Sequence, residues 1–470
     1  MLRRTFMRAG ALAVTATAVL AACGGGGAPP AGAAGGTGGS SPESPGVEAG
    51  TEPLASTSPP TSPDHGMQPA FPFGERRALV GGRYPFGIGP TLAGSALGTA
   101  AMDDAIRASY GAWKTANLRP SPAFTASTGS LAGQRIADGL HVRFTNTAYA
   151  TVSEGMGYGL LITVVMAGHD PEAQALFDGL LRTARGRPAH AWMSSGHPEA
   201  AYLMEWRLAA DMGSAGDGWN ATDGDLDMAL ALLMADRQWG SAGAVDYRRE
   251  ALASIHALKS INFAASGEPR GPQRANSRTS DHMVGHFRSF RAATDDAFWD
   301  RAIDRCLALV EAIVATYSPL AGLQPGFIVD CDTATPSPSP GWLIESAWEG
   351  DYDANATRNP WRWGTDFVFS GDPRWAQVVD RMVRFLKADC GEDPFQLAGL
   401  YRLNGDAIGG RYFAESVAGP LMVGCLVHAD HQRLLDTLWA THAAHFTTDY
   451  YDSELQLLPM LVAAGHWWVP

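Results

Sequence analysis

Apolar residues recur at helical spacing along most of the chain beyond residue 70, and this pattern limits the folds open to it. Loops rich in Gly, Pro, aromatic and charged residues separate the apolar segments. Strand-like alternation is scarce, with 140–144 and 326–330 as the best short examples. The expected helices span residues 103–115, 156–167, 173–185, 225–239, 247–261, 298–317, 373–388, 414–426, 434–444 and 455–464. We therefore expect a single all-α domain over residues 69–470.

The segment 1–23 has the features of an export signal. Arg3 and Arg4 form a charged start, and the apolar stretch that follows is too short to span a bilayer. It ends in Leu-Ala-Ala-Cys, which resembles the lipobox of bacterial lipoproteins, so Cys23 is the expected lipidation site. A plain export signal is the alternative. Residues 24–68 are mostly Gly, Pro, Ser, Ala and Thr, which predicts a disordered tether on an exported protein of the bacterial cell envelope, on its periplasmic or surface side.

Charge and cysteine spacing argue against several classes of function. The 470 residues carry a net charge of −13, which disfavours a nucleic-acid partner and suits a neutral or cationic substrate. The cysteines of the expected domain lack the CxxC or CxxH spacing of a zinc site. We expect buried free thiols for most of them, although an exported protein can form disulfides. These cysteines are Cys306, Cys331, Cys390 and Cys425.

One carboxylate stands among glycines at an expected helix start. Glu154 lies in the run SEGMGYG, with Leu160 and Leu161 directly after it. Glycines let a ligand or another backbone approach closely, and the free N–H groups of a first helical turn favour negative charge. Glu154 is therefore either a functional acid or a first-turn charge behind the N-cap Ser153, worth about 0.3–1 kcal/mol.

A second motif places Asp223, Asp225 and Asp227 at the start of another expected helix. Three carboxylates exceed what capping requires. The spacing resembles a calcium loop, but Met228 stands where that loop needs Gly and no Glu occupies its twelfth position. Calcium is therefore not expected.

The third motif mixes aromatic, acidic and basic side chains over residues 348–366. Aromatic rings stack on sugar faces, while carboxylates and guanidinium groups hydrogen-bond sugar hydroxyls. The motif therefore favours a sugar site.

Four motifs in order carry a resemblance to a known family. They are the Glu154 run, ATDGDLDMALALLMADRQWG from Ala221, NPWRWGTDF from Asn359 and YYDSELQLLPMLVAAGHWW from Tyr450. Together they resemble glycoside hydrolase family 8, which contains endo-β-1,4-glucanases, lichenases, chitosanases and some xylanases. The resemblance implies an (α/α)6 barrel, a toroid of about twelve helices with a substrate cleft on one rim.

The resemblance also implies catalytic roles. Glu154 matches the general acid, and Asp225 matches the acidic residue that binds and distorts the sugar at the cleavage point. An acid must be protonated near neutral pH, so we expect burial or the nearby Asp225 to raise the pKa of Glu154. Inversion needs a second carboxylate about 6.5–9.5 Å across the bond to activate a water.

The identity of this base is open. In the cellulase branch it is an Asp three residues before the Arg of the R-x-P-W-R run. Here that Arg is Arg358 and the position holds Asn355, which cannot act as a base. Some branches, chitosanases among them, carry Asn there and take a Glu from a nearby loop. Glu349 and Asp353 are equal candidates, ahead of Asp351, and Asp353 would serve if a two-residue slip restored the cellulase arrangement.

Further residues are expected to bind the sugar: Tyr158, Trp206, Arg207, Asp223, Arg358, Trp361, Arg362 and Tyr451. Each could instead pack in the core or rim. His282 and His286 lie four apart on an expected helix, but without the Glu of an HExxH motif they are not expected to bind metal.

The expected protein is a monomeric, endo-acting, inverting hydrolase of β-1,4-linked glucan, cellulose-type or mixed-linkage, that needs no metal or cofactor. A chitosanase of the same family is the alternative, favoured by Asn355 and by the negative charge. A non-catalytic glycan-binding lipoprotein is the alternative of another class, and the presence of Glu154 and Asp225 counts against it.

Overall fold

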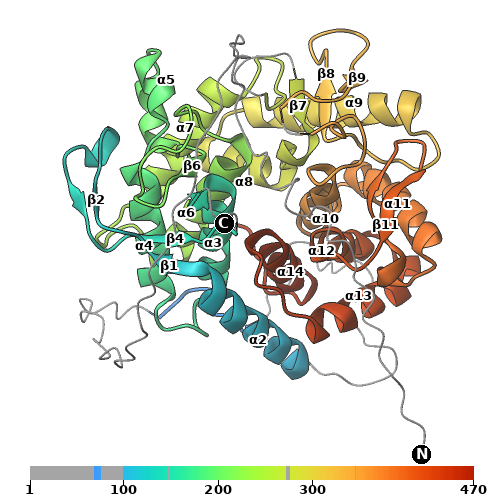
Figure 1. The fold of residues 1–470 in the computed structure, drawn as a ribbon, viewed down its shortest axis with the longest axis horizontal. Helices are drawn as coiled ribbons and strands as arrows, with labels where there is room; N and C mark the ends of the chain where they lie inside the picture. Colours follow the sequence, from blue (N-terminus) through green and yellow to red (C-terminus); the bar gives the residue numbers. More distant parts are fainter. Residues whose placement is uncertain (1–67, 76–98, 146–148, 271–275, 345) are drawn as a thin grey trace, which may run out of the picture.

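Helices arranged in two concentric layers make up most of the computed structural model (Figure 1). The structure describes residues 68–75, 99–145, 149–270, 276–344 and 346–470. The expected export signal, Cys23 and all but the last residue of the expected tether lie outside these ranges.

The layers form a closed ring within the described residues. The inner helices are α3 (Ser153–Val165), α6 (Thr222–Trp239), α8 (Val284–Thr294), α10 (Asn359–Ser370), α12 (Glu415–Gly424) and α14 (Tyr450–Ala463). The outer helices are α4 (Ala173–Gly186), α7 (Tyr247–Asn262), α9 (Phe298–Tyr317), α11 (Pro373–Cys390), α13 (Gln432–Ala444) and α2 (Thr99–Asn117). α14 packs against α3 and closes the ring, and α2 covers α14 from outside. The (α/α)6 barrel is confirmed.

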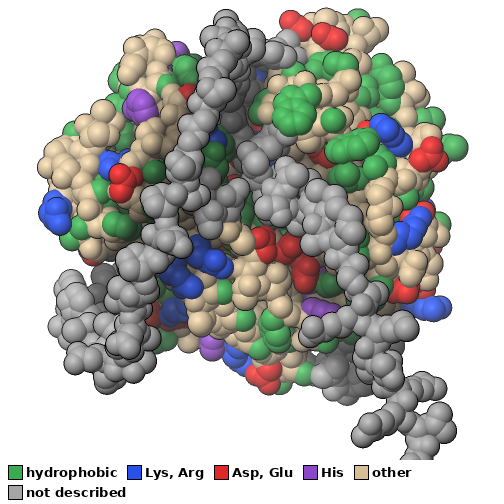
Figure 2. All heavy atoms as spheres, in the orientation of Figure 1, with side chains coloured by type: hydrophobic (Ala, Val, Ile, Leu, Met, Phe, Trp, Pro, Cys, Tyr) green, Lys and Arg blue, Asp and Glu red, His purple; other side chains and the backbone are tan. Residues whose placement is uncertain are grey.

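Burial distinguishes the two layers. Every residue of α3 is buried, as expected for a helix enclosed on all sides. α11 buries one apolar stripe that includes Trp375, Val379 and Leu386, and its charged residues face solvent. Figure 2 shows basic and acidic side chains beside one another along the right-hand edge, where α11 lies in Figure 1. The core therefore lies between the two rings and inside the inner one.

The strands are short antiparallel pairs in the connecting loops. They are β1 (Leu118–Pro120) with β4 (Leu140–Val142), β2 (Phe124–Thr125) with β3 (Arg135–Ile136), β5 (Thr151–Val152) with β6 (Arg207–Leu208), β10 (Ala398–Tyr401) with β11 (Ala407–Arg411), and β7 (Asn276–Arg278) with β8 (Phe327–Val329), which also pairs with β9 (Ser337–Pro338). The predicted strands 140–144 and 326–330 coincide with β4 and β8.

Each of the ten predicted helices overlaps an observed one, whereas α10 was missed. Its apolar period is interrupted by Arg362 and Asp366, which are buried because each pairs with an opposite charge. The short α5 (His190–Ser194) was missed as well. His286 lies on α8 as expected, but His282 precedes that helix. Cys306, Cys331, Cys390 and Cys425 are buried free thiols.

The two ends of the barrel are built from different parts of the chain. Residues at the starts of α3, α6 and α14 approach one another through Arg358, which directly precedes α10. The segment 68–75 packs at the opposite end, where Phe73 N–H donates to Ala167 O beyond α3 and Ala70 N–H donates to Gln238 O near the end of α6. Among the helices of the described ranges, none has the length and hydropathy needed to cross a bilayer.

Candidate active site

Glu154 lies at the beginning of α3, where several inner helices converge. Its side chain is buried, with 2% of its surface exposed. Arg358 Nη1 donates to Glu154 Oε2, and the Tyr450 hydroxyl donates to Oε1 at 3.1 Å. Arg358 ends the short 3-10 helix η5 (Ala356–Arg358), and Tyr450 opens α14. Two parts of the chain that are distant from α3 in sequence therefore hold this carboxylate.

A second carboxylate shares the same arginine. Arg358 Nη1 donates to Asp223 Oδ2 at 3.0 Å, and Arg278 Nη2 of β7 lies 3.1 Å from Asp223 Oδ1. Arg278 Nε also donates to Asp281 Oδ1 at 3.0 Å. All of these side chains are buried. We call Glu154, Asp223, Asp281, Arg278 and Arg358 the carboxylate cluster.

The carboxylates of this cluster have different pKa values. Burial raises the pKa of Glu154 to about 7; Arg358 opposes this effect and Asp223 reinforces it. Burial would also raise the pKa of Asp223, but Arg278 and Arg358 together hold it below its usual value. A carboxyl group with a raised pKa thus lies beside one whose pKa is held low, the arrangement that allows one acid and one carboxylate in the same site.

Asp225 does not take the position that the sequence predicted. Its carboxylate accepts hydrogen bonds from Met204 N–H and Asn220 Nδ2, both at 2.9 Å. Residues two apart on a helix point in different directions, so α6 directs Asp223 into the cluster and Asp225 toward the loop that holds Met204. Asp223 is therefore the neighbour of Glu154 that was expected of Asp225.

Glu349 and Asp351, two of the three expected bases, form hydrogen bonds with neighbouring loops. Glu349 is fully buried and accepts hydrogen bonds from the N–H groups of Ile344 and Ser346 at 3.0 and 3.2 Å. Asp351 Oδ2 accepts a hydrogen bond from Arg402 Nη1 at 2.7 Å.

Asp353 caps η5 with one oxygen. Its Oδ1 accepts hydrogen bonds from Asn355 N–H and Ala356 N–H at 3.0 and 3.2 Å, while Oδ2 meets Asn355 Nδ2 at 3.5 Å. Burial raises the pKa of Asp353 to about 7. Asn355 Oδ1 accepts a hydrogen bond from Arg358 Nη2 at 2.8 Å. Asn355 thus touches the cluster directly, and Asp353 adjoins the cluster through Asn355.

Trp361 and Arg362, both expected to bind sugar, lie in the barrel interior. Arg362 donates to both oxygens of Asp227 at 2.7 and 2.6 Å, and His286 Nε2 lies 2.8 Å from Asp227 Oδ1. The Arg362 guanidinium is 3.9 Å from the Trp361 ring centre, and Trp361 meets Tyr158 edge-on at 5.7 Å. These contacts join α6, α8 and α10, and they account for the third Asp of the motif and for His286.

The remaining expected residues lie near the cluster or its rim. The Tyr158 hydroxyl is 3.4 Å from Arg358 Nη1. The Arg207 guanidinium lies 4.1 Å from the Trp206 ring centre, and the Tyr451 hydroxyl donates to Ala354 O at 2.9 Å. Trp206 Nε1 and Arg207 Nε are buried without a hydrogen-bond partner in the described ranges. Arg207 is the first residue of β6 and Trp206 directly precedes it, so both lie beside β5, the strand that leads into Ser153 and Glu154.

Sequence reasoning missed Arg278, Asp281 and Tyr450. Tyr450 begins the fourth family motif, and it directly precedes Tyr451, which was predicted to bind the sugar. Arg278 and Asp281 lie in SRTSDH, a polar run whose burial no local pattern indicates. Within the described residues, no group of three metal-ligating side chains forms.

Proteins of known family share the sequence and the fold of this chain. The model of the family "Glycosyl hydrolases family 8" matches residues 135–465. A β-glucanase of Niallia circulans is 32% identical over 78% of this chain and 86% of its own, and an endoglucanase of a Bacillus species is 34% identical over 68% and 67%. The structure of a β-1,3-1,4-glucanase from Paenibacillus sp. X4 matches with a TM-score of 0.75 at 30% identity, over 86% of this chain and 100% of that one. The chain is therefore a glycoside hydrolase and belongs to family 8.

Proposed function

We propose that the protein is an endo-acting, inverting β-glucanase that cleaves β-1,4 bonds in cellulose-type or mixed-linkage glucan. The observation that carries this proposal is Glu154, a buried carboxyl group with a pKa of about 7 held beside ionised Asp223. The relatives named β-glucanase, endoglucanase and β-1,3-1,4-glucanase support glucan as the substrate class.

In the proposed mechanism, Glu154 donates its proton to the glycosidic oxygen as the bond breaks. Asp223 stays ionised, accepts hydrogen bonds from the sugar at the cleavage point and stabilises its developing positive charge. Tyr450 and Arg358 fix the orientation of the acid. A water on the opposite face of the ring, activated by a base, completes inversion.

We propose Asp353 as that base. Its Oδ2 is the less tightly held oxygen, and its elevated pKa suits proton acceptance near neutral pH. The carboxylate of Glu349 is bound by several backbone N–H groups and that of Asp351 by Arg402.

Azide rescue of Ala variants at Glu349, Asp351 and Asp353 tests this assignment. Glu345 is the remaining acidic residue of the segment 345–353. It lies outside the described residues, and its Ala variant enters the same panel. Azide can replace the attacking water, so it should restore glycosyl transfer only where the base is lost. Rescue at any position other than Asp353 contradicts the assignment.

Reducing-end release from carboxymethylcellulose, mixed-linkage β-glucan, chitosan and xylan tests the substrate. We expect glucan cleavage, lost in Glu154→Gln, and an α-anomeric product in proton NMR of early digests. Chitosan cleavage alone would favour the chitosanase alternative. Binding of glucan without release from any substrate would favour the glycan-binding alternative.

We also propose that the protein is exported as a monomer and is lipid-anchored through Cys23. The segment 68–75 packs at the barrel end opposite Glu154, and α6 alone separates the two ends by roughly 27 Å over its 18 residues. An anchor on this side would leave the cleft facing away from the membrane. Cys23→Ser should release the protein from membranes, and a membrane-bound variant would contradict the assignment; size-exclusion chromatography tests the monomer.

A further inference from the structure

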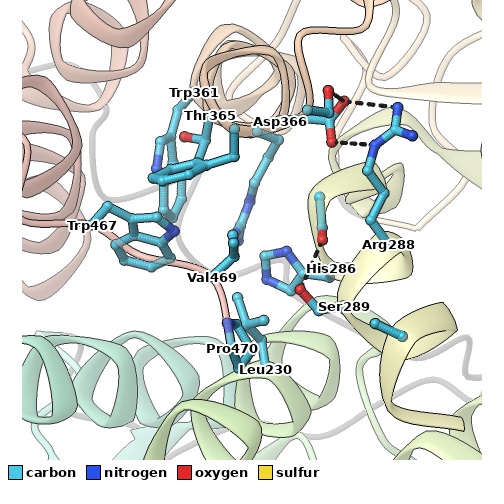
Figure 3. A pocket seen from close by; sticks show the side chains of 15 residues that line it. Leu230, His286, Arg288, Ser289, Trp361, Thr365, Asp366, Trp467, Val469 and Pro470 are labelled. Carbon is cyan, nitrogen blue, oxygen red and sulfur yellow. Dashed lines mark hydrogen bonds and ion pairs between the residues drawn. The ribbon is translucent and has the colours of Figure 1, made fainter. Parts of the chain in front are cut away.

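A cavity of about 250 Å³ lies between the inner helices α6, α8 and α10 (Figure 3). On its wall Arg288 pairs with both Asp366 and Asp372, and Figure 3 shows the first of these pairs. Trp467 and Val469 follow α14, whose start faces the carboxylate cluster, so they bound the cavity from the opposite barrel end. The cavity therefore offers no path for a substrate chain that leaves the cluster along the rim.

An exposed group of aromatic side chains lies on the rim beside α12 and α14. The ring centre of Phe395 is 5.5 Å from that of Phe413 and 5.9 Å from that of His445. The rings of Phe413 and His445 are 5.3 Å apart, and Phe446 follows His445 in sequence. Phe395 is 45% exposed and Phe446 54%. We call Phe395, Phe413, His445 and Phe446 the aromatic patch.

The aromatic patch lies at the same barrel end as Glu154. Phe395 belongs to the loop that connects the end of α11 to the start of α12. His445 and Phe446 belong to the loop that connects the end of α13 to the start of α14. Figure 1 shows α11 and α13 outside α12 and α14 on this side of the ring. Phe446 is four residues before Tyr450, which donates to Glu154, so the Cα atoms of Phe446 and Tyr450 are at most about 14 Å apart.

The exposure of these rings is not accounted for by the fold. Of the seven large hydrophobic residues that are exposed in the described ranges, Phe395, Tyr412 and Phe446 lie in the patch or next to it in sequence. Each exposed ring forgoes part of the roughly 1.5–3 kcal/mol that burial of such a side chain contributes. Apolar side chains that gather on the surface of a soluble protein mark a binding site.

The charges beside the patch favour a neutral occupant. Asp393 caps the turn that holds Phe395, and Asp449 caps α14 directly after the loop of Phe446. Both basic residues of the loop between α11 and α12 pair with carboxylates. An anionic partner such as a lipid surface or a nucleic acid would be repelled. A sugar chain suits the patch, because aromatic rings stack on sugar faces and carboxylates accept hydrogen bonds from sugar hydroxyls.

We propose that the aromatic patch binds the glucan chain beyond the cleavage point and gives the enzyme a preference for long substrates. This inference rests on the proposed function, because the occupant is the substrate of the carboxylate cluster. The patch is continuous with that cluster, since one short loop leads from Phe446 to Tyr450. A chain held at both places gains contacts that a short oligosaccharide cannot make.

Glucan binding by the full chain with Glu154→Gln tests the inference, because this variant should bind glucan with little cleavage. Calorimetry compares mixed-linkage β-glucan with cellotriose. We expect the polymer to bind more tightly, and Phe446→Ala in the same chain should weaken polymer binding several-fold while cellotriose binding changes little. Equal losses for the two ligands, or no loss for the polymer, would overturn the proposal.

Further variants separate ring stacking from a structural effect. Phe446→Tyr keeps an aromatic ring and should keep the polymer affinity. Phe395→Ala should weaken polymer binding, and it keeps the test valid if Phe446→Ala folds poorly. Tyr317→Ala is the matched control, because it removes a 39% exposed ring at the end of α9, outside the patch, and should change nothing. Equal losses in Tyr317→Ala and Phe395→Ala would contradict the site.

Failure of this inference can be told from failure of the proposed function. If the unsubstituted chain neither binds nor cleaves glucan, the proposed function is wrong and the inference falls with it. If it cleaves glucan and the patch variants bind the polymer as tightly as their parent, this inference alone is wrong. A second copy of the chain is the competing occupant, and a dimer in size-exclusion chromatography that Phe446→Ala abolishes would also overturn the inference.

Discussion

At the scale of single residues, the proposed mechanism depends on Glu154 and on the neighbours that set its protonation. Glu154→Gln keeps the size of the side chain and removes the proton donor, so we expect turnover of glucan to fall by about 10²–10⁴-fold. Affinity for cello-oligosaccharide, measured by calorimetry, should change little. Retained turnover would show that another group is the acid.

The pH profile follows from the same residue. Glu154 must be protonated to act, so activity should fall as pH rises through about 7. Asp223 helps to raise this pKa, while Arg358 lowers it. Asp223→Asn should therefore move the alkaline limb down by about one pH unit or more, in addition to reducing turnover.

Asp225→Asn is the matched control for this shift. It neutralises a buried carboxylate on the same helix that hydrogen-bonds to Met204 and Asn220. Its alkaline limb should stay in place even if the variant is less stable. An equal shift in both variants would mean that Asp223 does not act through Glu154.

The residues found and missed by sequence differ in one physical respect. Glu154 and Arg358 belong to local motifs with unusual residue types, so the chain itself marks them. Asp223 and Asp225 are two positions apart and of the same residue type, and only the directions in which they leave α6 distinguish them. Arg278 reaches the cluster from β7, which is far away in sequence, so no local pattern could place it.

At the scale of elements, the glycines of the motifs set the spacing of α3 and α6. A Cβ on Gly224 would lie 2.5 Å from the Ser153 carbonyl carbon, whereas one on Gly111 of α2 would meet nothing within 4 Å. Gly224→Ala should therefore destabilise the fold by about 1–3 kcal/mol. Gly111→Ala should stabilise it by about 0.5–1 kcal/mol. Urea denaturation measures both, and the same sign for the two would contradict this explanation.

Arg362, which the sequence predicted as a sugar-binding residue, joins α10 to α6 through Asp227. The motif predicted a charged site, and the charge proved to be paired inside the barrel, which sequence cannot distinguish from a cleft. Arg362→Met leaves buried Asp227 with only His286 beside its carboxylate, so we expect a loss of about 3–5 kcal/mol in stability.

The control for Arg362 is Arg433, whose side chain is 83% exposed beside Glu392. Arg433→Met should change stability by about 0–1 kcal/mol, since exposed pairs contribute little. Comparable decreases in the melting temperature of the two variants would show that the buried Arg362–Asp227 pair contributes no more stability than the exposed Arg433–Glu392 pair.

At the scale of the whole molecule, the helical period of the sequence predicted a single all-α domain because each helix buries a local apolar face. Ring closure is not local, since α2 and α3 both pack against α14, which lies near the other end of the sequence. The resemblance to a family supplied that step, and periodicity alone could not. The short strands β4 and β8 could also be predicted, because the alternation of apolar residues is a local pattern, as helical spacing is.

The segment 68–75 adds a test of how independent the two barrel ends are. Phe71 stacks on Trp468 with ring centres 4.2 Å apart, and Phe73 is buried against His466. A chain that starts at Gly74 loses both rings, and burial of one such side chain is worth about 1.5–3 kcal/mol. Compared with a chain that starts at Gln68, it should melt at a lower temperature yet turn over glucan at an unchanged rate at 25 °C, because Glu154 lies at the far end. Loss of turnover in the folded shorter chain would show that the ends are coupled.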